Sequence, residues 1–135
     1  MTPRLREFLR FCAVGSAGFV VDAGLLLALV STGVSPVAAR LVSVPAAVVT
    51  TWWLNRIWTF ARAARVAPHR QLWGYLLVQG VGALTNFAVF ATILALVEPT
   101  RVAALSAMAV GSGTGLLVNF TGVRRYIFRS AIEDR

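Results

Sequence analysis

Seven consecutive residues, Leu54-Asn55-Arg56-Ile57-Trp58-Thr59-Phe60, bring an amide, a guanidinium and two aromatic rings to the end of a long apolar stretch. A planar guanidinium beside an amide can hold a phosphate through two hydrogen bonds. Aromatic rings here are typical of the depth at which a bilayer meets water, and they could also stack on a sugar. The segment predicts a phosphate-headgroup site formed by Asn55, Arg56 and Trp58, although Arg56 could also act only as a topology anchor.

A weaker copy of this segment closes the last apolar stretch of the chain, at Gly122-Val123-Arg124-Arg125-Tyr126-Ile127-Phe128. Arg124 stands four residues before Phe128, as Arg56 stands four residues before Phe60, but Val123 replaces the asparagine. Arg124 is therefore a second candidate for phosphate contact, and we expect it to contribute less than Arg56.

Besides Arg10 and Arg56 near their ends, the apolar stretches contain two further charged residues. Asp22 lies in the middle of the first stretch, and Arg40 lies near the start of the second. A charge inside a bilayer is costly and marks a functional site by default. Helical rise places the two residues at compatible depths, so we expect an ion pair between them. The pair either only joins the first two helices or opens to bind a lipid phosphate.

Uncharged polar residues and glycines mark the later stretches. Asn86 and Asn119 would form interhelical hydrogen bonds or contact a headgroup that crosses the membrane. The Gly111-x-x-x-Gly115 spacing predicts a close-packing face, within the helix bundle or between subunits. Because four helices enclose little space, we expect a homo-oligomer or a groove open to lipid.

The composition favours lipid as the solvent. Of 135 residues, 58% are hydrophobic and 13% are charged, whereas soluble domains have about 45–50% and about 25%. The net charge of +8 does not indicate nucleic acid, because no basic-aromatic groove or helix-turn-helix pattern stands apart from the apolar stretches. One cysteine, Cys12, excludes an intrachain disulfide. No metal-ligand cluster, paired carboxylates or nucleotide loop is apparent, so we expect neither a cofactor nor enzymatic activity.

The fold class expected is an all-α membrane protein, with residues 1–135 forming one transmembrane domain. Four stretches reach the length of about 20 residues that a bilayer core requires: Phe8–Ser31, Val37–Trp58, Leu72–Val97 and Val102–Val123. Short turns join the first two and the last two, with Pro36 and Pro99 where helices begin. Eleven of the thirteen arginines flank one side, which predicts that both termini and the loop over 61–71 are cytoplasmic.

The two halves of the chain are similar. A shift of 64 residues places Gly15, Gly18 and Asp22 on three residues of the third stretch: Gln79, Gly82 and Asn86. A shift of 68 residues aligns the second stretch with the fourth. These matches predict two parallel two-helix repeats, one over about 8–62 and one over about 72–130, related by an axis along the membrane normal.

The combined pattern resembles the GtrA family of small four-helix membrane proteins. The residues that carry the resemblance are Phe11, Gly15, Asp22, Ala39-Arg40-Leu41-Val42-Ser43, residues 54–60, Asn119-Phe120 and Arg124 to Phe128. The resemblance implies translocation of a polyprenyl-phosphate sugar across the bacterial cytoplasmic membrane for cell-envelope glycosylation. The alternative is a membrane anchor that recruits a glycosyltransferase and moves nothing, as is proposed for some members of the family.

A third interpretation is a small multidrug-type exporter, which also has four helices and one acid within the membrane. That type usually has a glutamate and a weak charge bias, so Asp22 and the strong arginine asymmetry fit it poorly. A translocator and a recruiting anchor remain the two functions to separate.

Overall fold

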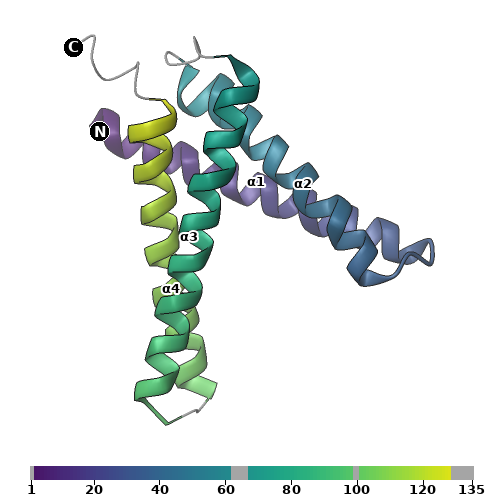
Figure 1. The fold of residues 1–135 in the computed structure, drawn as a ribbon, viewed down its shortest axis with the longest axis vertical. Coiled ribbons are helices and arrows are strands. Elements are labelled where there is room, and N and C mark those ends of the chain that lie inside the picture. The colour runs from purple at the N-terminus through teal and green to yellow at the C-terminus, as the bar shows by residue number, and fades with distance from the viewer. Residues whose placement is uncertain (1, 62–66, 99–100, 129–135) are drawn as a thin grey trace. The chain divides into compact units, whose positions relative to one another are not determined.

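The computed structural model describes residues 2–61, 67–98 and 101–128. Within these ranges the chain forms four α-helices and no strand, which confirms the all-helical prediction (Figure 1). The helices are α1 (Pro3–Ser31), α2 (Pro36–Leu54), α3 (Pro68–Leu96) and α4 (Arg101–Gly122). Two π-helical segments, η1 (Asn55–Thr59) and η3 (Val123–Ile127), continue α2 and α4.

The helices belong to two compact units, each an antiparallel helical hairpin. The first hairpin contains α1, α2 and η1, and the second contains α3, α4 and η3. The two helices of each hairpin lie side by side (Figure 1). Each hairpin therefore has a turn at one end and an open end, where its first helix begins and its π-helix finishes.

The turn of the first hairpin is fixed by local hydrogen bonds. The N–H of Thr32 donates to the carbonyls of Leu29 and Val30, and Gly33 adopts a φ of 91°, which favours glycine. The Ser35 hydroxyl accepts a hydrogen bond from the N–H of Ala38 at 3.3 Å and caps α2. Pro36 is the first residue of α2, as predicted, whereas Pro99 lies outside the described residues.

Glycines set the distance between helices in both hairpins. In the first, a side chain at Gly18 would collide with the Thr51 methyl group. In the second, a side chain at Gly82 would collide with Asn119, and Gly111 and Gly115 both face Asn86. The Gly111-x-x-x-Gly115 face therefore packs inside the second hairpin, with backbones in close approach.

The two hairpins bury equivalent residues. With the shifts of 64 and 68 residues, buried positions coincide at Phe11 and Tyr75, Gly18 and Gly82, Ala39 and Ala107, Ser43 and Gly111, and Phe60 and Phe128. The contact between Gly18 and Thr51 likewise matches the contact between Gly82 and Asn119. The two hairpins share one packing scheme, and the parallel arrangement of two repeats stays a prediction.

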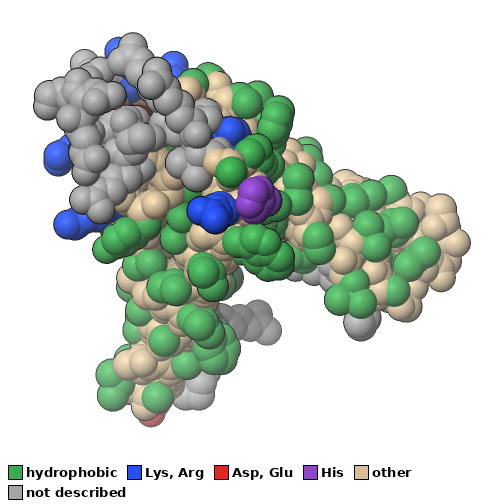
Figure 2. Space-filling model, turned by 45° about the horizontal axis from the view of Figure 1, so that its top comes forward, with side chains coloured by type: hydrophobic (Ala, Val, Ile, Leu, Met, Phe, Trp, Pro, Cys, Tyr) green, Lys and Arg blue, Asp and Glu red, His purple; other side chains and the backbone are tan. Residues whose placement is uncertain are grey.

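Two of the helices, α1 and α3, are long and apolar enough to cross a membrane, with 29 residues each. Only 11% and 6% of their most apolar segments are buried, whereas the core helix of a soluble protein is mostly buried. Hydrophobic side chains accordingly cover much of the visible surface of the helices (Figure 2). These exposed apolar surfaces are what lipid would cover.

The second and fourth helical segments extend to their predicted ends, whereas the expected extent of the middle loop was wrong. The second and fourth α-helices end at Leu54 and Gly122, and the residues that follow are π-helical. The loop expected over 61–71 ends earlier, because α3 begins at Pro68 and already includes His69. Proline at the first helical position explains this start, since its ring presets the helical φ and its missing N–H is not needed there.

Candidate functional site

The π-helical end of the first hairpin determines which side chains reach the surface. The N–H of Phe60 donates to the carbonyl of Asn55 at 2.8 Å, a bond that spans five residues. Residues five apart therefore share one side, and Asn55 and Phe60 are both buried, with exposed fractions of 1% and 4%. Trp58 is 46% exposed. π-Helical turns are frequently found at functional sites.

Arg10 of α1 joins this end of the hairpin by two contacts with Trp58. Its Nη1 donates a hydrogen bond to the Trp58 carbonyl at 3.2 Å, and its Cζ lies 5.5 Å from the centroid of the Trp58 ring. Carbonyls at a helix C-terminus lack partners within the helix and carry partial negative charge, so they attract a guanidinium. Arg10 therefore holds α1 and η1 together at the open end.

Arg56 lies over a second tryptophan. Its Cζ is 6.0 Å from the centroid of the Trp52 ring, and the Trp52 and Trp53 rings are 5.8 Å apart. The Trp52 Nε1 and Thr59 Oγ1 atoms are buried and have no hydrogen-bond partner among the described residues. This end of the hairpin therefore combines two guanidinium groups, which can donate to an anion, with an indole N–H and a hydroxyl that are buried inside the hairpin.

Asn55 does not share a surface with Arg56, contrary to the expected side-by-side contact with one phosphate. Asn55 is buried inside the hairpin at 1% exposure, whereas Arg56 is half-buried. Phe60 and Phe128 are likewise buried, so only Trp58 and Tyr126 present the expected rings at the surface. The π-helical turn explains the difference, because it places residues 55 and 60 on the same inner side.

The remaining predicted site residues fall into separate places. Asp22 is half-buried on α1 and makes an interaction within the protein, but the Arg40 side chain lies outside the described part of the structure. The predicted ion pair between them therefore stays a prediction. In the second hairpin, Asn86 and Asn119 lie together in the seam between α3 and α4, and Arg124 lies half-buried on η3.

Sequence reasoning missed Arg10 as part of the site and counted it only among the topology arginines. A signal for it exists in the short turn at residues 32–35, which fixes the register of the two helices. In an antiparallel hairpin, residues equally far from the turn lie level with each other. This register places Arg10 near residues 57 and 58, as it places Gly18 near Thr51.

The helices and their apolar surfaces define a helical membrane protein. Residues 10–131 match the family described as GtrA/DPMS, transmembrane domain, and the chain belongs to this family, as the sequence predicted. A similar protein in Bacillus subtilis (strain 168), the uncharacterised membrane protein YngA, is 24% identical over 131 residues. The match covers 97% of this chain and 85% of the relative. The family suggests a role in handling lipid-linked sugars.

Proposed function

We propose that this protein moves the headgroup of a polyprenyl-phosphate-linked sugar across the bacterial cytoplasmic membrane, for glycosylation of cell-envelope polysaccharide. The observation that carries the proposal is the pair of arginine–tryptophan contacts at the open end of the first hairpin, Arg10 with Trp58 and Arg56 with Trp52. Membership of the GtrA/DPMS family supports a lipid-linked sugar as the ligand.

The two contacts suit capture of a phosphate. A guanidinium stacked on an aromatic face directs its N–H groups outward in the plane of the fork, where they match phosphate oxygens. Bonds from charged donors to phosphate are about twice as strong as neutral ones, so the two arginines would dominate binding.

The distribution of charge supports a cytoplasmic location for this site. Seven of the nine described arginines lie at the open ends of the hairpins, whereas Arg40 and Arg101 lie toward the opposite ends. The seven are Arg4, Arg6, Arg10 and Arg56 in the first hairpin and Arg70, Arg124 and Arg125 in the second. By the positive-inside rule these open ends face the cytoplasm. The proposed topology is four membrane crossings with both termini cytoplasmic.

The proposed translocation makes and breaks no covalent bond, so the protein is not an enzyme in this scheme. The prenyl chain stays in the bilayer and only the headgroup crosses. Passage would be passive, driven by a gradient or assisted by a partner such as a membrane glycosyltransferase. A homo-oligomer would enclose the headgroup better than one chain.

The test is reconstitution in liposomes that contain a labelled polyprenyl-phosphate sugar, with headgroup access scored from each side. We expect the wild type to equilibrate the label between leaflets faster than liposomes without protein, and the double variant R10Q/R56Q to lose most of this acceleration. No acceleration by the wild type would contradict translocation. Co-purification of an active glycosyltransferase in that case would favour the recruiting anchor.

A further inference from the structure

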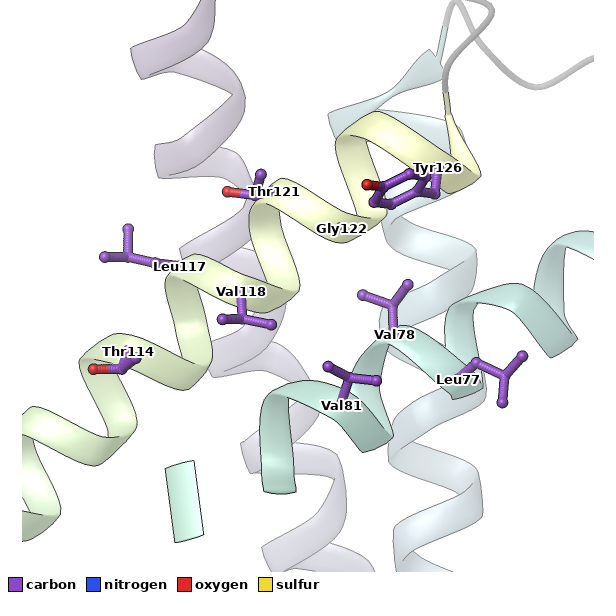
Figure 3. Close-up of a pocket in the computed structure, with 9 residues that line it drawn as sticks. All are labelled: Leu77, Val78, Val81, Thr114, Leu117, Val118, Thr121, Gly122 and Tyr126. Atoms are coloured by element: carbon purple, nitrogen blue, oxygen red, sulfur yellow. The ribbon is translucent and has the colours of Figure 1, made fainter. Parts of the chain in front are cut away.

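The second hairpin contains a groove that the proposed phosphate site does not use. It has a volume of about 560 Å³ and lies between α3 and α4, next to η3 (Figure 3). Leu77, Val78 and Val81 line it from α3, and Leu117 and Val118 line it from α4. Grooves and pockets of about 300–1,000 Å³ are typical of sites for small organic ligands.

The walls of the groove offer hydrocarbon contacts and almost no hydrogen bonds. The Thr114 hydroxyl donates to the Val110 carbonyl at 2.8 Å, so its hydrogen bond stays within α4. At Gly122, an added Cβ would lie 2.7 Å from the Val78 Cγ1 atom, so α3 and α4 come close together there. The occupant that fits such walls is a hydrocarbon chain.

One end of the groove is next to positive charge. Tyr126, which lines the groove, is 70% exposed and belongs to the five-residue η3. The same short segment carries Arg124, which is half-buried, and Arg125, which is exposed. A molecule in the groove would therefore have its hydrocarbon chain between α3 and α4 and an anionic group near η3.

We propose that this groove binds the chain of the polyprenyl-phosphate lipid at a second position, in which the phosphate lies toward Arg124 and Arg125 and not at Arg10 and Arg56; this inference rests on the proposed function. A single groove bounded by one helix on each side accepts one chain, whereas a phospholipid has two. Bilayer lipid is as apolar as the groove, so burial alone gives no preference. Selection would come from the fit of a methyl-branched chain against the valine walls.

The experiment compares two tryptophan substitutions on α3. Val81→Trp fills the groove, and Leu84→Trp is the control, because Leu84 is 71% exposed and does not line the groove. Binding of two probes, a long-chain polyprenyl phosphate and a two-unit prenyl phosphate, is measured in phosphatidylcholine nanodiscs. We expect Val81→Trp to weaken long-chain binding about tenfold and to leave short-chain binding unchanged, a selective loss equal to roughly 1.4 kcal/mol.

Several results would contradict the proposal that the groove binds the prenyl chain. Equal long-chain affinity in the two variants would do so, as would equal competition by a two-chain dialkyl phosphate. A change in oligomeric state confined to Val81→Trp would show that a second copy occupies the groove. If the wild type binds the long chain in the groove but moves no headgroup in liposomes, the proposed translocation is contradicted. The proposed binding of the prenyl chain in the groove is then supported independently.

A second measurement uses the wild type, in case Val81→Trp does not insert. A polyprenyl phosphate with a photoreactive diazirine on its chain should label residues 114–122 of α4, where the groove lies. Labelling confined to outward positions such as Leu84 would contradict the proposal.

Discussion

The two hairpins share a buried frame but differ in the chemistry at their open ends. In the first, Arg10 contacts Trp58, and Arg56 lies over Trp52. The position equivalent to Arg10 in the second hairpin is Gly74, where an added Cβ would lie 2.7 Å from the Ile127 side chain. Close packing thus replaces a cation at the same place in the frame. The residues that the two hairpins share therefore build the hairpin, and the residues that differ are the candidates for ligand binding.

The interiors of the two hairpins also differ in charge, and the charged residue again belongs to the first hairpin. Asp22 of the first hairpin corresponds to Asn86 of the second, and Thr51 corresponds to Asn119. The second hairpin thus has neutral amides where the first has a carboxyl and a hydroxyl. Its Asn119 Oδ1 atom is buried without a hydrogen-bond partner among the described residues. A charged residue is therefore not required for the packing of such a hairpin. Packing alone does not explain why residue 22 is an aspartate.

The largest effect is expected when the carboxyl of the first hairpin is neutralised. If Asp22 pairs with Arg40, the substitution Asp22→Asn leaves a cation uncompensated, and breaking a buried pair costs about 3–5 kcal/mol. The double variant D22N/R40L should recover stability and membrane abundance relative to either single variant. Thermal unfolding in detergent measures this, and equal stability of all variants would exclude the pair.

The next effect tests the packing that the hairpins share. Gly82→Leu should destabilise the second hairpin by about 1–3 kcal/mol, because the new side chain overlaps Asn119. Gly80→Leu is the matched control on the same helix, since an added Cβ at Gly80 meets nothing within 4 Å. Similar unfolding temperatures for the two variants would show that the α3–α4 seam is looser than the structure indicates.

Much of the shared packing of the two hairpins can be predicted from the sequence. Apolar stretches of bilayer length with short turns containing Gly33 and Pro36 predict antiparallel helical pairs, and the Gly111-x-x-x-Gly115 spacing predicts a close-packing face. The π-helical ends could not be predicted, because a bond spanning five residues depends on backbone geometry that side-chain periodicity does not determine. The burial of Asn55 and Phe60 follows from that bond.

A smaller effect, on activity and not on stability, separates the two open ends. Arg56→Lys keeps the charge but loses the planar fork, so we expect headgroup translocation to fall about tenfold, or roughly 1.4 kcal/mol. Arg124→Lys should have the smaller defect, since Gly74 stands at the position where Arg10 adds a second guanidinium in the first hairpin. Both variants are compared at matched abundance in liposomes. Full activity of Arg56→Lys would leave this arginine with an anchoring role only.

The smallest effect on activity is expected from exchanging Asn55 for its equivalent in the second hairpin, Val123. Both residues are buried, at 1% and 0% exposure, so Asn55→Val should fit the same space. Asn55 makes an interaction within the protein, so the substitution leaves its partner unsatisfied and should lower stability by about 1–3 kcal/mol. Because the structure places Asn55 inside the hairpin, away from the surface that Arg56 reaches, we expect translocation within about twofold of the wild type, or roughly 0.4 kcal/mol. A loss as large as that of Arg56→Lys, measured at matched membrane abundance, would restore the sequence-based role of Asn55 in orienting the headgroup. It would also require the π-helical turn to open when the lipid binds, which would make η1 the moving part that distinguishes the first hairpin from the second.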